Sequence, residues 1–158
     1  MIVEELTDYA QNFLEEKYGM SLDIPIVINK RLRSTLGSFI LTKDKPHEIE
    51  MAGFLIEYGA DDVIYDTLRH ELIHYALFMQ GRQYRDGTLE FENELRKHNV
   101  GSTKTVFVGK VYKFICEACL GEYESLKKSI VTSPKKYRTK CCKANIVPRG
   151  EVAYNGLE

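Results

Sequence analysis

The sequence predicts an α+β fold, with a domain of helices and short strands over residues 1–101 and a small β-rich module over residues 102–158. Hydrophobic periodicity runs in the order helix, strands, two helices, then strands again. The first part carries 11 Lys and Arg against 18 Asp and Glu, whereas the second carries 11 against 5 and holds all four cysteines. A length of 158 residues suits one domain with an appendage, which agrees with this division.

The first predicted element is a helix over residues 2–18. Apolar side chains recur along it at helical spacing from Val3 to Tyr18, and Gly19 offers a C-terminal stop. A short apolar run comes next and begins near Pro25. Because proline is tolerated at the start of a strand, this run is predicted to be a strand.

Two more strands are predicted at residues 37–42 and 48–52, where short apolar segments recur. The sequence Lys-Asp-Lys-Pro at residues 43–46 lies between them and has the residue types that favour a turn. The two strands are therefore expected to form a hairpin or meander.

A long helix is predicted to start at Asp61 and Asp62, which are expected to act as its N-cap, and to end at Gly81. Between these limits apolar residues trace one helical stripe. A further helix is predicted after Thr88, which can cap it, and Gly101 is expected to close it. Beyond that glycine the pattern becomes strand-like, most clearly over residues 110–115.

The N-terminal segment and the hydropathy favour a cytosolic protein. No apolar run approaches the ~20 residues that a membrane span needs. Glu4 and Glu5 stand where a secretion signal would be basic, and no apolar segment follows them. In the cytosol, paired cysteines more often hold a metal than form disulfides.

The motif His-Glu-Leu-Ile-His at residues 70–74 lies in the middle of the long predicted helix. Residues four apart share a helix face, so His70 and His74 can reach one metal ion. Glu71 is turned away from direct ligation but lies close enough to take a proton from a water molecule on the metal. This pattern of residue types is typical of a zinc hydrolase, with Glu71 as the general base.

Two histidines do not complete a catalytic zinc site, which needs a third protein ligand and one open position. The longer motif with a third histidine at position 80 is excluded, because Gln80 stands there. Spacing alone leaves five candidates open downstream, namely Asp86, Glu90, Glu92, Glu94 and His98.

The cysteines predict a second, structural zinc ion. Cys116 and Cys119 form a C-x-x-C pair, but the partner pair consists of the adjacent Cys141 and Cys142, with Thr139 where a cysteine is expected. Adjacent cysteines reach one zinc ion only if the backbone bends unusually. Four thiolates on one zinc ion remain the simplest interpretation, because a β-rich tail of this size has little core. A disulfide and free thiols are the alternatives.

The basic residues of the tail suggest contacts with nucleic acid. Cations can follow a phosphate backbone, and Tyr123 and Tyr137 can stack on bases. The alternative is that these cations only solvate a module that completes the fold. The predicted nucleic-acid contacts are Lys127, Lys128, Lys135, Lys136, Arg138 and Lys140.

Residues 25–101 resemble the SprT-like family, which includes the Spartan proteases that act on DNA–protein crosslinks. The resemblance rests on three stretches, at residues 31–38 (Arg-Leu-Arg-Ser-Thr-Leu-Gly-Ser), at 66–75 (Asp-Thr-Leu-Arg-His-Glu-Leu-Ile-His-Tyr) and from Gly81 to Phe91. It implies a zincin-like metalloprotease domain of bacterial or phage type. The tail is similar to the zinc ribbon that often ends bacterial members.

The resemblance also selects a third zinc ligand. Family members carry a histidine shortly after the long helix, and matching Gly81, Tyr84 and Phe91 puts Asp86 in that position. Carboxylates are accepted zinc ligands, so this substitution is compatible with a metal site. The resemblance further implies that the strand at residues 48–52 lies at the sheet edge above the zinc, where it can pair with an extended peptide.

These expectations describe a zinc metallopeptidase with one catalytic and one structural zinc ion. Its implied substrates are proteins, including those bound or crosslinked to DNA, and its implied partner is single-stranded or damaged DNA. The alternative is a nucleic-acid-binding accessory protein with a catalytically weak zincin domain, which the departures at Asp86 and Thr139 motivate.

Overall fold

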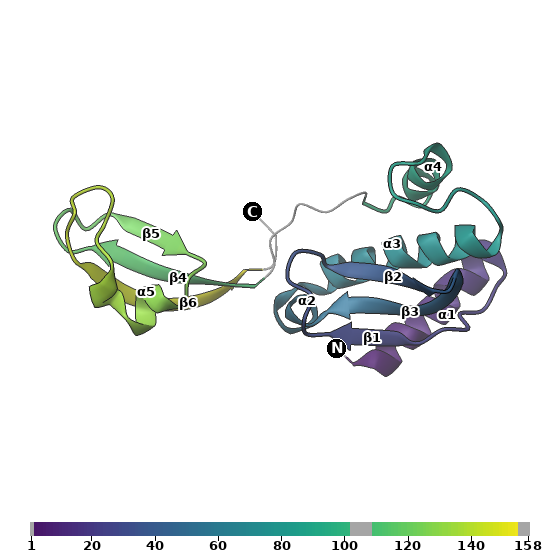
Figure 1. Ribbon diagram of the computed structural model, residues 1–158, viewed down its shortest axis with the longest axis horizontal. Helices are drawn as coiled ribbons and strands as arrows, with labels where there is room; N and C mark the ends of the chain where they lie inside the picture. The colour runs from purple at the N-terminus through teal and green to yellow at the C-terminus, as the bar shows by residue number, and fades with distance from the viewer. Residues whose placement is uncertain (1, 102–108, 155–158) are drawn as a thin grey trace. The chain divides into compact units, whose positions relative to one another are not determined.

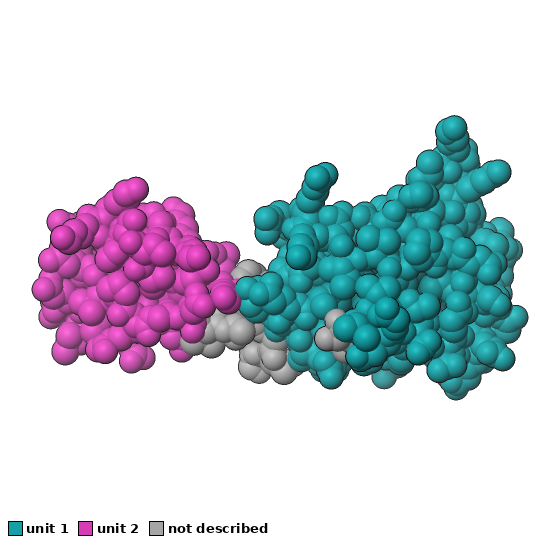
Figure 2. Space-filling model, turned by 90° about the horizontal axis from the view of Figure 1, so that it is seen from below, with its two compact units in different colours: residues 1–106 teal, residues 107–158 magenta. Residues whose placement is uncertain are grey.

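The computed structural model describes residues 2–101 and 109–154, and it divides the chain into two compact units (Figures 1 and 2). Unit 1 comprises residues 1–106 and unit 2 residues 107–158. The predicted boundary between residues 101 and 102 adjoins residues 102–108, which lie outside the described residues. Both units contain helices and a small sheet, so the mixed α and β composition that the sequence predicts is confirmed.

Unit 1 contains one three-stranded sheet with the order β1-β3-β2. Strand β1 runs parallel to β3, and β2 runs antiparallel to it. The predicted hairpin is confirmed, with Lys43 and Asp44 at φ of 52° and 62° in the two-residue turn. The strands are β1 (Ile26–Asn29), β2 (Gly37–Thr42) and β3 (Lys45–Ala52).

The strand at residues 48–52 is not an edge strand, so this expectation was wrong. These residues belong to β3, which pairs with β2 on one side and with β1 on the other. Strand β1 pairs in parallel with β3, with Ile26 opposite Ile49, so the side of β3 that was expected to be open is already paired. The outer strand that contacts the long helix is β2 instead.

Four helices complete the described part of unit 1, namely α1 (Val3–Tyr18), α2 (Gly53–Tyr58), α3 (Asp61–Met79) and α4 (Leu89–Lys97). The first predicted helix is confirmed, with Gly19 at φ 62° as its left-handed C-cap. The short α2 was not predicted. The N-cap of α3 is Ala60, so the two aspartates lie in the first turn rather than at the cap. Helix α4 ends before Asn99, at φ 57°, and not at Gly101.

The core of unit 1 forms where α1 and α3 pack beside each other and contact the sheet (Figure 1). Leu6 and Leu14 of α1, Ile49 of β3 and Leu68 and Leu72 of α3 are fully buried. Burial of each such side chain contributes about 1.5–3 kcal/mol. Helix α3 is consequently covered on several sides, which fixes the direction of the side chains that it presents to the candidate site.

Unit 2 is built on a second three-stranded sheet, with the order β5-β4-β6 and antiparallel pairing throughout. This confirms the β-rich tail and the strand predicted at residues 110–115. The elements of this unit are β4 (Gly109–Cys116), β5 (Glu122–Ser125), α5 (Ser129–Thr132), the 3₁₀ turn η1 (Pro134–Lys136) and β6 (Ile146–Tyr154). Among the helices of the described residues, none has the length and apolar composition to cross a membrane.

Candidate metal centres

Helix α3 brings His70, Glu71 and His74 together on its buried surface. The two histidines are four residues apart, and their ring centroids lie 4.9 Å from each other. All three side chains are buried, and each offers a ligand atom within 4.8 Å of those of the other two. The motif in the sequence is therefore one compact group in the structure, with a geometry that could hold a metal ion.

Asp86 joins this group from the loop between α3 and α4. Its Oδ1 atom lies 3.1 Å from Nε2 of His70 and 3.4 Å from Nε2 of His74. Two ligand atoms on a tetrahedral zinc ion, with bonds of ~2.0–2.1 Å, lie about 3.3 Å apart. Both distances from the Asp86 carboxylate therefore fit ligands of a shared ion. The carboxylate is 58% exposed, so the position is reachable from solvent.

The other nitrogen of each imidazole fixes the tautomer of the ring. Nδ1 of His70 lies 2.9 Å from the carbonyl oxygen of Gly101, and Nδ1 of His74 bonds to the carbonyl oxygen of Tyr84. A carbonyl only accepts, so both Nδ1 atoms carry hydrogen, and a neutral ring then has its lone pair on Nε2. Burial lowers the pKa of His74, which favours this neutral form.

With both Nδ1 atoms protonated, three hydrogen-bond acceptors lie close together at the site. Two Nε2 lone pairs face a carboxylate, which is acceptor-only when ionised. Such an arrangement is favourable when a cation lies between the three atoms, and nitrogen and oxygen donors of this kind suit zinc. The donor set of His70, His74 and Asp86 therefore fits a divalent metal ion.

Glu71 lies beside this group, held between α3 and the outer strand. Burial raises the pKa of its carboxyl to about 8, the negative charge of Asp86 acts in the same direction, and a hydrogen bond from the backbone N–H of Phe39 opposes them. Gly37 allows β2 to come this close, since a Cβ atom there would lie 3.3 Å from Cγ of Glu71 and 3.1 Å from Cγ2 of Thr67. A carboxyl with a pKa in this range can both accept and donate a proton near neutral pH.

Phe91 forms the packed side of the site, a role that the sequence did not indicate. It lies fully buried on α4, with its ring stacked on His74 and edge-on to His70. In the sequence Phe91 is only one member of the apolar stripe of a helix, and no local signal marks it as a support for the histidines.

A cleft of about 320 Å³ opens beside His74, Glu71 and Asp86. One wall is the outer strand β2 and the other is the loop that carries Asp86. The ring of Tyr84 lies in this second wall, packed edge-on against Phe39 and Phe78. The candidate metal position is thus bordered by a strand edge and by solvent-accessible space.

Each of the remaining candidates for a third ligand has a partner outside the group of His70, His74 and Asp86. Glu94 accepts hydrogen bonds from Tyr18, at 2.7 Å, and from Arg82, at 3.1 Å. His98 packs edge-on against Phe13 and Tyr18. The other two acidic candidates bond to different groups, Glu90 to Arg82 and Glu92 to the backbone N–H of Gly87.

The four cysteines come together at one end of the unit 2 sheet. Their sulfur atoms all lie within 4.8 Å of one another, and Sγ of Cys119 is 3.6 Å from Sγ of Cys141. Cys116 is buried, the other three are exposed, and none forms a disulfide. The adjacent Cys141 and Cys142 both reach the cluster, which therefore has the donor set of a structural metal site.

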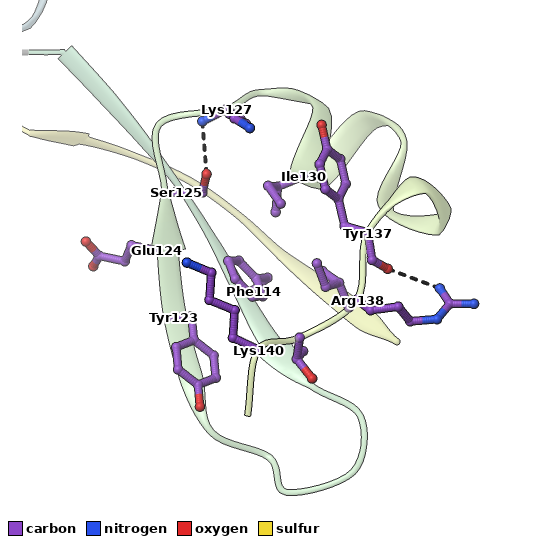
Figure 3. Close-up of a pocket in the computed structure, with 11 residues that line it drawn as sticks. Phe114, Tyr123, Glu124, Ser125, Lys127, Ile130, Tyr137, Arg138 and Lys140 are labelled. Carbon is purple, nitrogen blue, oxygen red and sulfur yellow. Dashed lines mark hydrogen bonds between the residues drawn. The ribbon is translucent and has the colours of Figure 1, made fainter. Parts of the chain in front are cut away.

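Unit 2 also contains a cavity of about 410 Å³ with aromatic walls and a basic rim (Figure 3). Phe114 and Tyr123 stack in it with ring centroids 5.6 Å apart, and Nζ of Lys127 lies 6.0 Å from the centre of the Tyr137 ring. Three of the six predicted nucleic-acid contacts line it, namely Lys127, Arg138 and Lys140. The other three, Lys128, Lys135 and Lys136, are exposed outside its lining.

A mixed α and β unit with a buried His-Glu-x-x-His helix, followed by a small unit with four clustered cysteines, defines a class of metalloprotease-like proteins. Within this class the chain belongs to the SprT-like family, whose model matches residues 3–106. This confirms the resemblance seen in the sequence.

Two relatives match most of the chain, and both are named "Protein SprT-like". The one from Bacillus subtilis (strain 168) is 29% identical over 149 residues, covering 90% of this chain and 95% of the relative. The one from Staphylococcus aureus (strain MRSA252) is 29% identical over 133 residues, covering 79% and 83% respectively. No match was found among solved structures.

Proposed function

We propose that this protein is a zinc-dependent metallopeptidase with a zincin-like catalytic domain and a C-terminal zinc ribbon. His70, His74 and Asp86 hold the catalytic zinc, and the four cysteines hold a structural one. The observation that carries the proposal is the position of the Asp86 carboxylate, which lies 3.1 Å from Nε2 of His70 and 3.4 Å from Nε2 of His74. In both rings the other nitrogen, Nδ1, is hydrogen-bonded to a backbone carbonyl.

The reaction is peptide-bond hydrolysis. A bound zinc ion supplies Lewis acidity, which polarises a carbonyl and lowers the pKa of coordinated water towards ~7. Glu71 accepts the proton of the attacking water on its carboxylate and delivers it to the departing amine nitrogen. The raised pKa of Glu71 suits both transfers, and the Phe39 N–H holds the carboxylate beside the cleft.

Protein is the proposed substrate class, with β2 as the surface that holds it. The outer strand borders the cleft next to Glu71. Pairing of an extended peptide with a strand edge uses main-chain hydrogen bonds and needs little sequence preference. Substrates of this kind include proteins bound or crosslinked to DNA, and the proposal places the enzyme in the cytosol.

Glu71→Gln tests the proposal, because it removes the proton acceptor without touching a metal ligand. The variant should retain the zinc content of the wild type, measured by elemental analysis, and lose at least about 100-fold in the cleavage rate of a protein substrate. Glu90→Gln is the matched control, since Glu90 bonds to Arg82 away from the cleft. Wild-type rates in Glu71→Gln would overturn the catalytic assignment.

A second function is supported by the cavity of unit 2, namely binding of single-stranded or damaged DNA. Aromatic walls offer stacking surfaces, and the cations at the rim offer contacts to phosphate. Binding to a single-stranded oligonucleotide, measured by fluorescence anisotropy, should weaken as salt rises. Lys127→Ala should reduce it more than Lys135→Ala, because Lys135 lies outside the cavity lining.

The two functions can be separated by experiment. If the wild-type chain binds DNA but never cleaves a DNA-bound protein, the chain is an accessory protein with a catalytically weak zincin domain. If it cleaves protein and its affinity for DNA does not depend on salt, electrostatic binding by unit 2 is wrong.

A further inference from the structure

The first cysteine-containing turn of unit 2 has a defined pattern of backbone hydrogen bonds. The N–H of Cys116 donates to the carbonyl of Gly121, five residues ahead, at 3.0 Å. The N–H of Leu120 donates back to the carbonyl of Cys116 at 2.9 Å. Leu120 has a left-handed backbone, with φ at 61°. In this turn the first and fourth residues, Cys116 and Cys119, both point sulfur into the cluster.

The second turn repeats this pattern with a threonine at the first position. The N–H of Thr139 donates to the carbonyl of Ala144, again five residues ahead, at 2.9 Å. The N–H of Lys143 donates back to the carbonyl of Thr139 at 2.9 Å, and Lys143 is left-handed with φ at 55°. Thr139 therefore occupies the place of Cys116, and Cys142 occupies the place of Cys119.

The sequence of the second turn explains why it contains two adjacent cysteines. The residue that should supply the first thiol is Thr139, which has none. The third residue of the turn, Cys141, brings its sulfur to 3.6 Å from that of Cys119 instead. The second turn thus has the same backbone conformation as the first, but one of its two thiols is at the third position of the turn instead of the first.

The side chain of Thr139 has not left the centre. It is 3% exposed, and its Oγ1 lies 3.3 Å from Sγ of Cys116. The same oxygen accepts a hydrogen bond from the N–H of Ala144 at 3.1 Å. Because the hydroxyl accepts from that amide, its own hydrogen is available for the sulfur of Cys116.

We propose that Cys141 supplies the ligand that Thr139 lacks, and that the Thr139 hydroxyl positions the Cys116 thiolate by donating a hydrogen bond to it. The inference rests on the proposed structural zinc and assigns a role to Thr139 and to Cys141, the two residues at which the second turn differs from the first. Groups that hydrogen-bond metal ligands orient them, and their loss weakens metal binding 10–100-fold in typical cases. Thr139 is a positioning residue here and not a ligand.

Cobalt(II) substitution of the full chain tests the ligand set, because thiolate-to-cobalt charge transfer reports on bound sulfur and not on the histidine site. Cys141→Ser should reduce this band by about a quarter, as one of four thiolates is lost. Adding Thr139→Cys to Cys141→Ser should restore the band, since it returns the thiol to the first position of the turn. Adding Lys140→Cys instead is the matched control and should not restore it.

Zinc affinity tests the role of the hydroxyl. In competition with a chelator, Thr139→Val should weaken binding at the cysteine cluster about 10-fold or more, whereas Thr139→Ser should keep it. Restoration by Lys140→Cys, or unchanged affinity in Thr139→Val, would overturn the inference. A wild-type chain without any charge-transfer band would instead overturn the structural zinc itself, while leaving the histidine site untouched.

Discussion

The ring of Phe91 stacks on the imidazole of His74, with centroids 3.9 Å apart and planes 11° from parallel. The same phenyl ring meets His70 edge-on at 5.2 Å. One fully buried side chain from α4 thus supports both histidines of α3. The position of the candidate ligands consequently depends on the packing between two helices.

Phe91→Ala should lower both stability and metal affinity. Deletion of a buried phenyl ring costs about 3–5 kcal/mol, and the histidines lose their common support. Urea unfolding measures the first effect and chelator competition the second. Leu95→Ala, which alters a buried residue of the same helix, should destabilise the chain without a comparable loss of zinc affinity. Equal losses of affinity in the two variants would contradict the supporting role.

Asp86→Ala should remove the zinc ion of unit 1 while the cysteine-bound ion stays. The loss of one of three protein ligands is expected to weaken binding at least about 100-fold, and elemental analysis after dialysis should find one zinc per chain instead of two. Glu90→Ala provides the comparison, because it was a candidate ligand in the sequence but pairs with Arg82 at 2.8 Å. Full zinc occupancy in Asp86→Ala would exclude this ligand.

Glu71 should make the metal-free protein less stable as the pH rises. Its pKa of about 8 lies above the ordinary value of 4.5, so the folded chain keeps this proton to a higher pH than the unfolded chain. The unfolding free energy then falls by about 1.4 kcal/mol per pH unit within that window. The depressed pKa of His74 gives the opposite slope below pH 6.5, and the lowered pKa of Cys116, about 6 against the ordinary 9.0, gives it between pH 6 and 9, so the contribution of Glu71 is measured against a variant that differs only at this residue.

The measurement for this prediction is the difference between wild type and Glu71→Gln, both with metal removed. Between pH 6.5 and 8 the wild type should lose about 2 kcal/mol relative to the variant, as urea titrations at several pH values would show. Parallel stability curves for the two proteins would mean that the carboxyl titrates in its ordinary range.

Gly37→Val should separate the outer strand from α3. A Cβ atom at this position already meets the backbone oxygen of Glu50 at 3.2 Å and Cγ of Glu71 at 3.3 Å, and valine adds two methyl groups. Overpacking of this kind costs about 1–3 kcal/mol. The cleavage rate should fall further than stability alone explains, because the Phe39 N–H moves away from Glu71. A variant with wild-type activity and reduced stability would show that β2 does not position this carboxyl.

Elements with a local signal could be predicted from the sequence. Helical periodicity and a terminal glycine gave α1 nearly to the residue, and the turn residues between β2 and β3 gave their hairpin. The expectation from the resemblance that residues 48–52 form an edge strand was wrong, because β1 pairs in parallel with β3. This pairing joins segments about 20 residues apart, and no local sequence signal in either segment indicates it. The N-cap of α3 was misplaced because aspartate is favourable both at a cap and in the first turn.

In the candidate site, too, some features could be predicted from the sequence and others could not. The spacing of His70 and His74 follows from helix geometry alone, so their convergence was predictable. The groups that fix their tautomers were not, because the carbonyls of Tyr84 and Gly101 are backbone atoms that any residue could supply. The convergence of Asp86 depends on the path of a loop, so spacing left it as one of five candidates and only the family resemblance selected it.

The bond between His70 and Gly101 has a practical consequence for anyone who divides this chain into fragments. Gly101 is held on both sides, since its N–H donates to Asp66 and its carbonyl accepts from the imidazole. A fragment cut directly after Gly101 would end in a carboxylate at the very atom that His70 contacts, adding a negative charge next to a candidate ligand. A cut several residues later would keep that carbonyl in an ordinary amide, and the fragment would then have the same charge next to His70 as the full chain.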